Sequence, residues 1–282
     1  MSRLSVVIPA YNAARFLGEA VGSLMDQRRR PDEVVIVNDA STDDTRRVVE
    51  RLRRRVPEVP IVYAENPKNL GGGATRNRAV GLARGEYLFC LDADNLLLPD
   101  TLHLFLDRAV EAYARTGGHC MVCPAFLQYF SDRFLIPRVD WIRVGRRMCH
   151  RWEFLDLSRA AILTNPVSPA SSGNYLYHRE IYERSGGYAE DCGAYDAWVF
   201  GARNCLAGYR FVVVEGVSYL HRQSPDGYWE REFIRGNRLD HMHRTFEHFR
   251  DVYTDETFAY LASVEVVGRL DWSKLRLRDP HT

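Results

Sequence analysis

Short apolar runs alternate with segments of helical periodicity over the first 110 residues, and this alternation constrains the fold more than any other feature. We expect four buried strands, at residues 4–8, 33–37, 60–63 and 87–91. Apolar residues recur at helical spacing in the stretches between them, at about 14–26, 42–55 and 71–83. Such alternation is typical of an α/β protein with a mostly parallel sheet.

The second half of the chain is less regular. A long strand is predicted at residues 120–130, followed after a Pro- and Ser-rich loop by a short strand at 175–178 and a helix at 179–185. A further helix is expected at 195–207, ended by Gly208, and then a strand at 211–214. The charged and aromatic tail from Tyr228 onward reads as helical.

Composition narrows the class of protein and its setting. The chain of 282 residues has 38 Lys+Arg against 37 Asp+Glu, so its net charge of +1 predicts no nucleic-acid partner. No apolar run approaches the roughly 20 residues that span a bilayer. Cys120 and Cys123 form a single CxxC, which reads as part of a buried strand rather than a zinc site. A reduced, cytoplasmic location is expected.

Arginines cluster at three places, residues 28–30, 51–55 and 143–147. One interpretation is that they are solvated helix ends and loops. The alternative is a basic rim that meets an anionic substrate or the inner face of a membrane, so peripheral membrane contact remains open.

Two acids follow the fourth predicted strand directly, in the stretch YLFCLDADN. Asp92 and Asp94 flank the small residue Ala93, and apolar residues lie on both sides of the motif. Burial of a carboxylate beside a strand is unfavourable unless something pairs with it. Two acids at this spacing can face one divalent cation, and hard oxygen ligands suit Mg²⁺ or Mn²⁺. The cation can in turn hold a diphosphate.

Two further segments are candidates for binding a nucleotide. The run Gly71-Gly72-Gly73 opens a predicted helix and resembles a phosphate loop, with Arg76 available to an anion, although it lacks GxGxxG spacing. A flexible turn is the alternative interpretation. Asp39 lies just past the second predicted strand, where a carboxylate can accept from a base or a ribose, or can cap the next helix.

Four segments, taken in order and spacing, resemble the family 2 glycosyltransferases. They are SVVIPAYNAARFLGEAVGSLMDQ, DEVVIVNDASTDDT, NLGGGATRNRAVGLARGEYLFCLDADN and GNYLYHREIYERSGGY. The resemblance is strong over residues 4–100 and extends to about 221. It implies a GT-A fold, which is a Rossmann-like nucleotide-diphospho-sugar transferase fold, and sugar transfer with inversion at the anomeric carbon.

The resemblance also implies residue roles and a domain plan. Pro9, Ala10 and Tyr11 would line the base pocket and Asp39 would hold the base, usually uracil. Arg76, Asp92 and Ala93 fall in segments that contact the nucleotide, Asp94 would bind the metal, and His221 falls near a further metal or diphosphate contact. One GT-A domain would span residues 1–225, with a nucleotide-binding half (1–115) and an acceptor-binding half (116–225). A helical extension would follow at 226–282.

The catalytic base is the largest departure from the family pattern. Members commonly have Glu-Asp-Trp-Asp near an ending like AGYR, with the first Asp as base; a gap-free match puts Asp196 in the Glu slot and Ala197 in the Asp slot. We therefore assign the base to Asp196, with Asp191 and Glu190 as alternatives. A smaller departure is Asn95, where a third acid is frequent.

The chain is expected to move a sugar from a nucleotide-diphosphate donor, a UDP-sugar by preference, to a glycan, a lipid-linked acceptor or a small molecule. Two alternatives remain: a degenerate member that binds a sugar nucleotide without transfer, and a sugar-nucleotide nucleotidyltransferase. The segment PAYNAAR after the first strand argues against the second, which usually carries a glycine-rich loop there. Acceptor contacts are expected in loops at about 130–175 and 222–240.

Overall fold

The computed structural model describes residues 2–130, 150–151, 163, 173–222, 227–228, 231–232 and 236–279. The expected acceptor loops at 130–175 and 222–240 lie largely outside these residues. Within them, nine strands form a single sheet: β1 (Leu4–Ala10), β2 (Glu33–Asn38), β3 (Ile61–Glu65), β4 (Tyr87–Cys90), β5 (Leu96–Leu97), β6 (Cys120–Phe130), β7 (His150–Arg151), β8 (Leu176–His178) and β9 (Arg210–Arg222). The strand order is β3-β2-β1-β4-β8-β6-β9-β5, with β7 beside β6.

The sheet is mostly parallel, which confirms the fold class expected from the sequence. β1 lies between β2 and β4 and is parallel to both, β3 continues this parallel set beside β2, and β6 runs parallel to β9 over a long register. The shorter antiparallel pairings join β8 to β4 and β6, and β5 to β9. Because the chain crosses from β3 to β4 over β1, a crevice is expected at the carboxyl ends of these strands.

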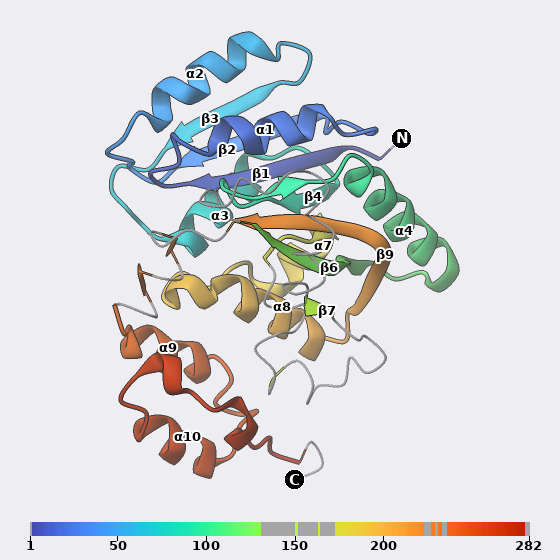
Figure 1. The fold of residues 1–282 in the computed structure, drawn as a ribbon. Coiled ribbons are helices and arrows are strands. Elements are labelled where there is room, and N and C mark those ends of the chain that lie inside the picture. The colour runs from blue at the N-terminus through green and yellow to red at the C-terminus, as the bar shows by residue number, and fades with distance from the viewer. Residues whose placement is uncertain are drawn as a thin grey trace.

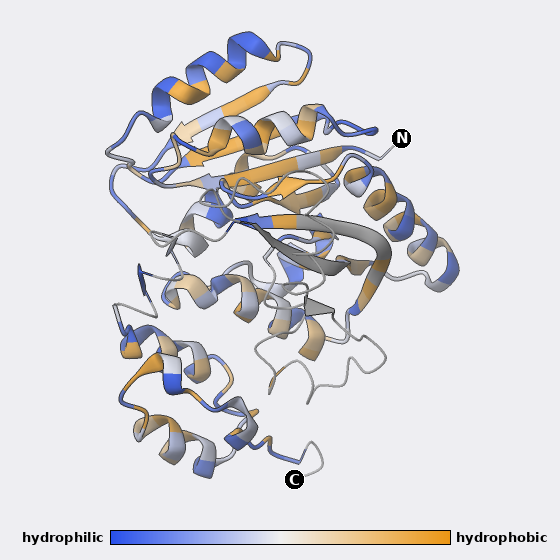
Figure 2. Ribbon diagram, in the orientation of Figure 1, coloured by the Kyte–Doolittle hydropathy of each residue, from blue (hydrophilic) through white to orange (hydrophobic). Residues whose placement is uncertain are grey.

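Helices cover both faces of the sheet (Figure 1). The helices are α1 (Leu17–Met25), α2 (Thr45–Arg55), α3 (Gly72–Leu82), α4 (Thr101–Thr116), α7 (Arg179–Ser185), α8 (Asp196–Leu206), α9 (Leu239–Glu247) and α10 (Asp255–Ala262). Successive strand residues point to opposite faces. Val6 and Ile8 therefore pack with α1, α2 and α4, whereas Val7 packs with α3, α7 and α8. Figure 2 shows the apolar strands enclosed by helices with polar outer sides.

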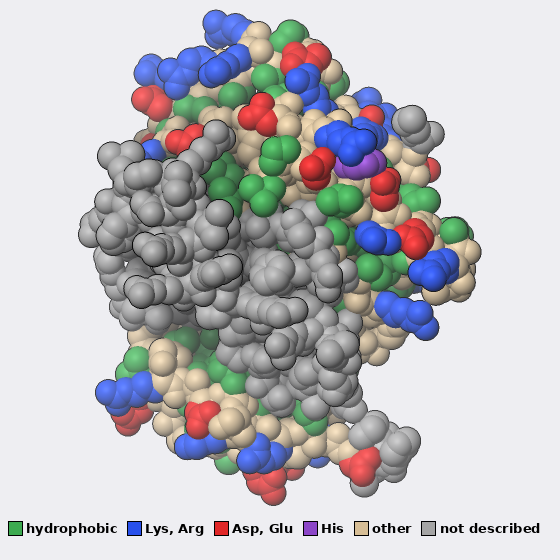
Figure 3. Space-filling model, turned by 45° about the vertical axis from the view of Figure 1, so that its right-hand side comes forward, with side chains coloured by type: hydrophobic (Ala, Val, Ile, Leu, Met, Phe, Trp, Pro, Cys, Tyr) green, Lys and Arg blue, Asp and Glu red, His purple; other side chains and the backbone are tan. Residues whose placement is uncertain are grey.

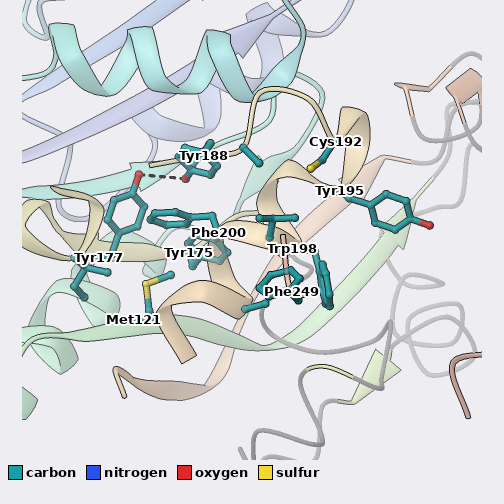
Figure 4. Packing of buried hydrophobic residues seen from close by; sticks show 14 of the residues in the cluster. Met121, Tyr175, Tyr177, Tyr188, Cys192, Tyr195, Trp198, Phe200 and Phe249 are labelled. Carbon is teal, nitrogen blue, oxygen red and sulfur yellow. Dashed lines mark hydrogen bonds between the residues drawn. The ribbon is translucent and has the colours of Figure 1, made fainter. Parts of the chain in front are cut away.

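The second of these cores is rich in aromatic rings. Phe200 of α8 packs among Tyr175, Tyr177 and Tyr188, and the hydroxyls of Tyr177 and Tyr188 are 3.2 Å apart (Figure 4). The same core includes Met242 and other residues of the C-terminal segment. The predicted division at residue 225 stays a prediction, but the described C-terminal residues pack directly onto α8.

Most element boundaries lie within three residues of those predicted, and the differences have local causes. Helix α1 begins at Leu17 rather than Ala14, because the carbonyl of Ala13 accepts from both Phe16 and Leu17 in a preceding turn. The strand predicted at 211–214 continues through the next apolar run as β9, since β6 supplies a long parallel partner. The two-residue strand β5 was not expected, because it exists only through its pairing with β9.

Two predictions about surface and cysteine chemistry can be placed in the fold. Cys120 and Cys123 are buried within β6 and face the two different cores, which confirms the interpretation as a strand. Arginines of the 51–55 cluster lie on α2; Figure 3 shows blue side chains gathered at that end of the molecule. The cluster at 143–147 lies outside the described residues. No helix of the described part is long and apolar enough to cross a membrane.

Candidate active site at the carboxyl ends of the parallel strands

The residues predicted to hold the nucleotide base lie at the carboxyl ends of β1 and β2. Ala10 is buried and its carbonyl accepts from the backbone N–H of Asp39 at 2.8 Å, which joins the two strand ends. Pro9 is half-buried within β1, and Tyr11 follows with 40% of its surface exposed. The three residues predicted to line the base therefore lie together at the carboxyl end of β1, beside Asp39.

Asp39 is 3% exposed, and its carboxylate organises the turn that leads into α3. It accepts from Nδ2 of Asn66 at 2.7 Å and from the backbone N–H groups of Leu70 and Gly71 at 2.8 and 2.9 Å. A carboxylate offers about four lone-pair positions, so three internal bonds leave one for a ligand N–H. The sequence did not single out Asn66, which is buried at the end of β3.

The glycine run is required by close packing. Gly71 has φ of +89°, which favours glycine. A Cβ on Gly72 would lie 2.9 Å from Oδ2 of Asp196, and a Cβ on Gly73 would lie 1.9 Å from the carbonyl oxygen of Ala189. The glycine run therefore lets α3 approach the segment that carries Asp196, the predicted catalytic base. This packing role holds whether or not the run also binds a phosphate.

Arg76 is the group that pairs with the buried acids. It projects from α3 and is 9% exposed; Nη2 lies 2.7 Å from Oδ1 of Asp92, and Nη1 forms an ion pair with Asp196. Burial lowers the pKa of the guanidinium, but the charges of Asp196 and Asp92 outweigh burial and hold that pKa well above its usual range. The structure thus brings together three predicted residues from α3, the end of β4 and the start of α8.

Asp92 is held on its other side by two amides. Its Oδ2 accepts from Nδ2 of Asn174 at 3.1 Å and of Asn95 at 3.3 Å, and its backbone N–H donates to Asn174. Asn95, which stands where a third acid is frequent, therefore orients the motif. Asn174 was missed by sequence reasoning; the only signal was its place two residues before β8, in GNYLYH.

Asp94 differs from Asp92 because no other side chain of the described structure donates a hydrogen bond to its carboxylate. Burial, together with the nearby charge of Asp92, raises its pKa to about 7. The turn itself is fixed by Arg222. Its Nε donates to the backbone carbonyl of Asp94 at 3.1 Å, and its backbone N–H donates to Oδ1 of Asn95 at 3.2 Å. A partly buried carboxylate with its oxygens available is what a cation ligand requires.

His221 lies beside this turn because β5, which follows the acids, pairs with β9. Leu96 is opposite Leu220, so His221 is placed next to the acidic motif. Burial lowers the pKa of the imidazole, and the charge of Asp92 acts in the opposite direction. Carboxylate oxygens and a neutral imidazole are donors that suit Mn²⁺, and the assignment of Asp94 and His221 as metal ligands stays a prediction.

The three candidate bases have different surroundings. Asp196 begins α8, is 2% exposed, and accepts from the N–H of Ala197 as well as from Arg76. Burial raises the pKa of its carboxyl, although Arg76 acts in the opposite direction. Glu190 is exposed and accepts from Nδ2 of Asn77 at 2.8 Å, and Asp191 is exposed and pairs with His248.

Comparison with known proteins finds relatives among bacterial glycosyltransferases and polysaccharide biosynthesis proteins. A curated relative, the GalNAc(5)-diNAcBac-PP-undecaprenol beta-1,3-glucosyltransferase of Campylobacter jejuni, is 31% identical over 122 residues, which is 43% of this chain and 39% of that protein. The succinoglycan biosynthesis protein ExoO of Rhizobium meliloti is 28% identical over 64% of this chain and 47% of its own length. The chain therefore spans less than half the length of either relative.

Solved structures share the fold. S. aureus TarS 1-349 in complex with UDP-GlcNAc superposes with a TM-score of 0.62 at 19% identity, covering 92% of this chain and 69% of that one. The mannosyltransferase PcManGT from Pyrobaculum calidifontis, in complex with GDP-Man and Mn²⁺, gives 0.59 at 24% identity over 87% and 64%. These likenesses confirm the GT-A type of fold. The family described as "Glycosyl transferase family 2" matches residues 5–186, and the chain belongs to that family.

Proposed function

We propose that the chain is an inverting glycosyltransferase that moves a sugar from a nucleotide-diphosphate donor, a UDP-sugar, to an acceptor hydroxyl with the help of Mn²⁺ or Mg²⁺. The observation that carries the proposal is the position of Asp39, Asp92 and Asp94 at the carboxyl ends of parallel strands, where the buried Arg76 pairs with Asp92. Ligands of open α/β sheets bind at this edge.

On the donor side, Pro9, Ala10 and Tyr11 would line the base and Asp39 would accept its N–H. Asp94 and His221 would hold the cation, and a cation bound there would supply positive charge to the leaving diphosphate. Asp92, Ala93 and Arg76 would shape the surface beneath the nucleotide. The available carboxylate of Asp94, beside an Asp92 already paired with Arg76, supports this division of roles.

On the acceptor side, Asp196 would take the proton. The acceptor oxygen attacks the anomeric carbon on the face opposite the diphosphate, the bond to the diphosphate breaks, and the hydroxyl proton passes to the carboxylate. Burial raises the pKa of Asp196, and a higher pKa makes its carboxylate a stronger base. Since Arg76 holds the carboxylate in the present arrangement, transfer requires that this ion pair loosen when donor and acceptor bind.

The acceptor class follows from the relatives and so belongs to the proposal. The Campylobacter relative is named for an undecaprenol-linked glycan, which supports a lipid-linked acceptor for this chain, with glycans and small molecules as the other candidates. A lipid-linked acceptor would place the enzyme at the cytoplasmic face of a membrane, where peripheral contact suffices.

One observation favours a second candidate, a sugar-nucleotide-binding protein without transfer. Ala197 stands where the catalytic base is expected, and the neighbouring Asp196 is bound to Arg76.

A thermal-shift screen of nucleotide-diphosphate sugars with and without Mn²⁺ identifies the donor, because a ligand that binds only the native state raises the melting temperature. Release of UDP from that donor with candidate acceptors then separates the two functions: turnover supports transfer, and binding without turnover supports the second candidate.

A further inference from the structure

All three candidate bases lie on one segment, residues 187–196, between α7 and α8. On the side of α3 the segment is held by Asn77, whose amide contacts the backbone of Tyr188 at 2.9 Å and the side chain of Glu190 at 2.8 Å. The tight approach of Ala189 to Gly73 holds it further. The nucleotide-binding half therefore fixes only one side of this segment.

The opposite side is held by the C-terminal segment. His248, which follows α9, places Nε2 at 2.8 Å from the carboxylate of Asp191, and its Nδ1 lies 2.8 Å from a guanidinium nitrogen of Arg203. A guanidinium only donates, so Nδ1 must accept and the ring proton must lie on Nε2, directed at Asp191. The geometry thus defines a chain of hydrogen bonds from α8 through His248 to the segment.

A second contact from the same helix lies close by. Gly193 has φ of +56°, and a Cβ at this position would lie 2.2 Å from Nδ1 of His241. The ring of His241 therefore rests on the backbone of the segment three residues before Asp196. Trp198 continues the contact into the core, where it packs against Phe249 with ring centroids 5.3 Å apart (Figure 4).

A metal ion is an alternative reason for bringing Asp191, Cys192 and His248 together, since their ligand atoms lie within 4.8 Å of one another. The ring tautomer argues against it. A metal on Nε2 would require a proton on Nδ1, which would then face the N–H groups of Arg203. The thiol of Cys192 itself donates to Oδ1 of Asp191 at 3.3 Å. The cluster is therefore held by hydrogen bonds.

We propose that the C-terminal segment is a positioning element of the transfer site, and that His248 acts by fixing residues 187–196 through Asp191. Asp191 is then an anchor rather than the base, and His248 is a positioning residue with no contact to substrate. The expected effect on sugar transfer rests on the proposed function. The fixing of residues 187–196 by His248 does not depend on that function.

Three variants of the full chain test the proposal. His248→Ala removes both hydrogen bonds, whereas His248→Gln keeps one acceptor and one donor on a side chain of similar reach. His243→Ala is the matched control, because this histidine lies on α9, five residues before His248, and makes no hydrogen bond or ion pair within the described structure. Amide hydrogen exchange of residues 188–196, UDP affinity and the rate of sugar transfer are measured for each.

We expect His248→Ala to speed exchange of residues 188–196 by about three- to tenfold, the effect of losing a partly exposed hydrogen bond to a carboxylate. Its kcat should fall by a similar factor while UDP affinity stays within twofold, with recovery in His248→Gln and no change in His243→Ala. Unchanged exchange in His248→Ala refutes the positioning role. Faster exchange with unchanged kcat refutes its link to transfer. If the parent protein transfers no sugar, the proposed function fails, and exchange alone still decides the structural part.

Discussion

Replacing Arg76 with Met should expose how much the buried acids depend on one cation. The substitution keeps much of the apolar volume but leaves Asp196, 2% exposed, with the N–H of Ala197 as its one remaining hydrogen-bond partner among the described residues. Asp92 is better placed, because two amides still hold it. Breaking a buried ion pair on one side costs about 3–5 kcal/mol. For 282 residues the unfolding entropy is about 0.6 kcal/mol/K, so the melting temperature should fall by about 5–8 °C.

The loss should have two further signatures. Burial already raises the pKa of Asp196, and removal of Arg76 raises it further, so the folded variant binds a proton at pH values where the unfolded chain does not. The loss of stability in Arg76→Met is therefore full at pH values above the pKa of Asp196 in the folded variant. It becomes smaller as the pH falls toward about 4, the ordinary pKa of an aspartate. Replacing both partners, in Arg76→Met with Asp196→Leu, should recover most of the stability.

The assay is urea and thermal unfolding followed by circular dichroism at several pH values. Arg108→Met is the control, because Arg108 forms an exposed ion pair with Glu111 and should lose less than about 1 kcal/mol. A loss of under 1 kcal/mol in Arg76→Met, or a deficit that grows on acidification, would refute the description of Arg76 as the cation that compensates buried carboxylates.

Three further predictions concern the packing of α3, recognition of the nucleotide base and removal of the acceptor proton. Gly73→Ala should destabilise the protein by more than about 1 kcal/mol and abolish transfer, since the added Cβ meets the carbonyl of Ala189. Gly81→Ala, exposed on the same helix with nothing within 4 Å, should instead stabilise the protein by up to about 1 kcal/mol in urea unfolding. Equal effects of the two substitutions would contradict the packing argument. Asp39→Ala should weaken UDP binding about tenfold to a hundredfold by calorimetry, the effect of a hydrogen bond to a charged group, and parent-like affinity would remove Asp39 from the base pocket. Asp196→Asn should retain UDP binding while initial transfer rates fall by about 100-fold or more; a fall of only a few-fold would point to Glu190 or Asp191.

Much of the nucleotide-binding half was predictable because its signals are local. The runs at 4–8, 33–37 and 87–91 are apolar except for Ser5 and Glu33, as expected of strands in a covered parallel sheet, and all three form strands. The position of the acidic motif just past β4 followed from the same pattern. The sequence indicated that something must pair with these acids and favoured a metal-bound diphosphate; that Arg76 pairs with Asp92 was not predicted.

What the sequence did not indicate depends on contacts between distant segments. Asn174 lies 82 residues from Asp92, and Arg222 lies 128 residues from Asp94, so no periodicity or spacing connects them. The pairing of Asp196 with Arg76 spans 120 residues and was likewise not predicted. Strand β5 has no signal of its own, because two residues become a strand only when β9 lies beside them.

The measurement that tests the central claim most directly is calorimetric titration of UDP into the protein, with Mn²⁺ and with excess chelator. The parent protein, Asp94→Ala and the control Asp100→Ala, an exposed acid six residues further on, are compared. A cation held by Asp94 between protein and diphosphate predicts tight binding to the parent and to Asp100→Ala in Mn²⁺. It also predicts a loss of about tenfold or more with chelator and, equally, in Asp94→Ala. UDP affinity that is the same with Mn²⁺ and with chelator, or unchanged by loss of Asp94, would contradict a metal–diphosphate site at the carboxyl ends of these strands.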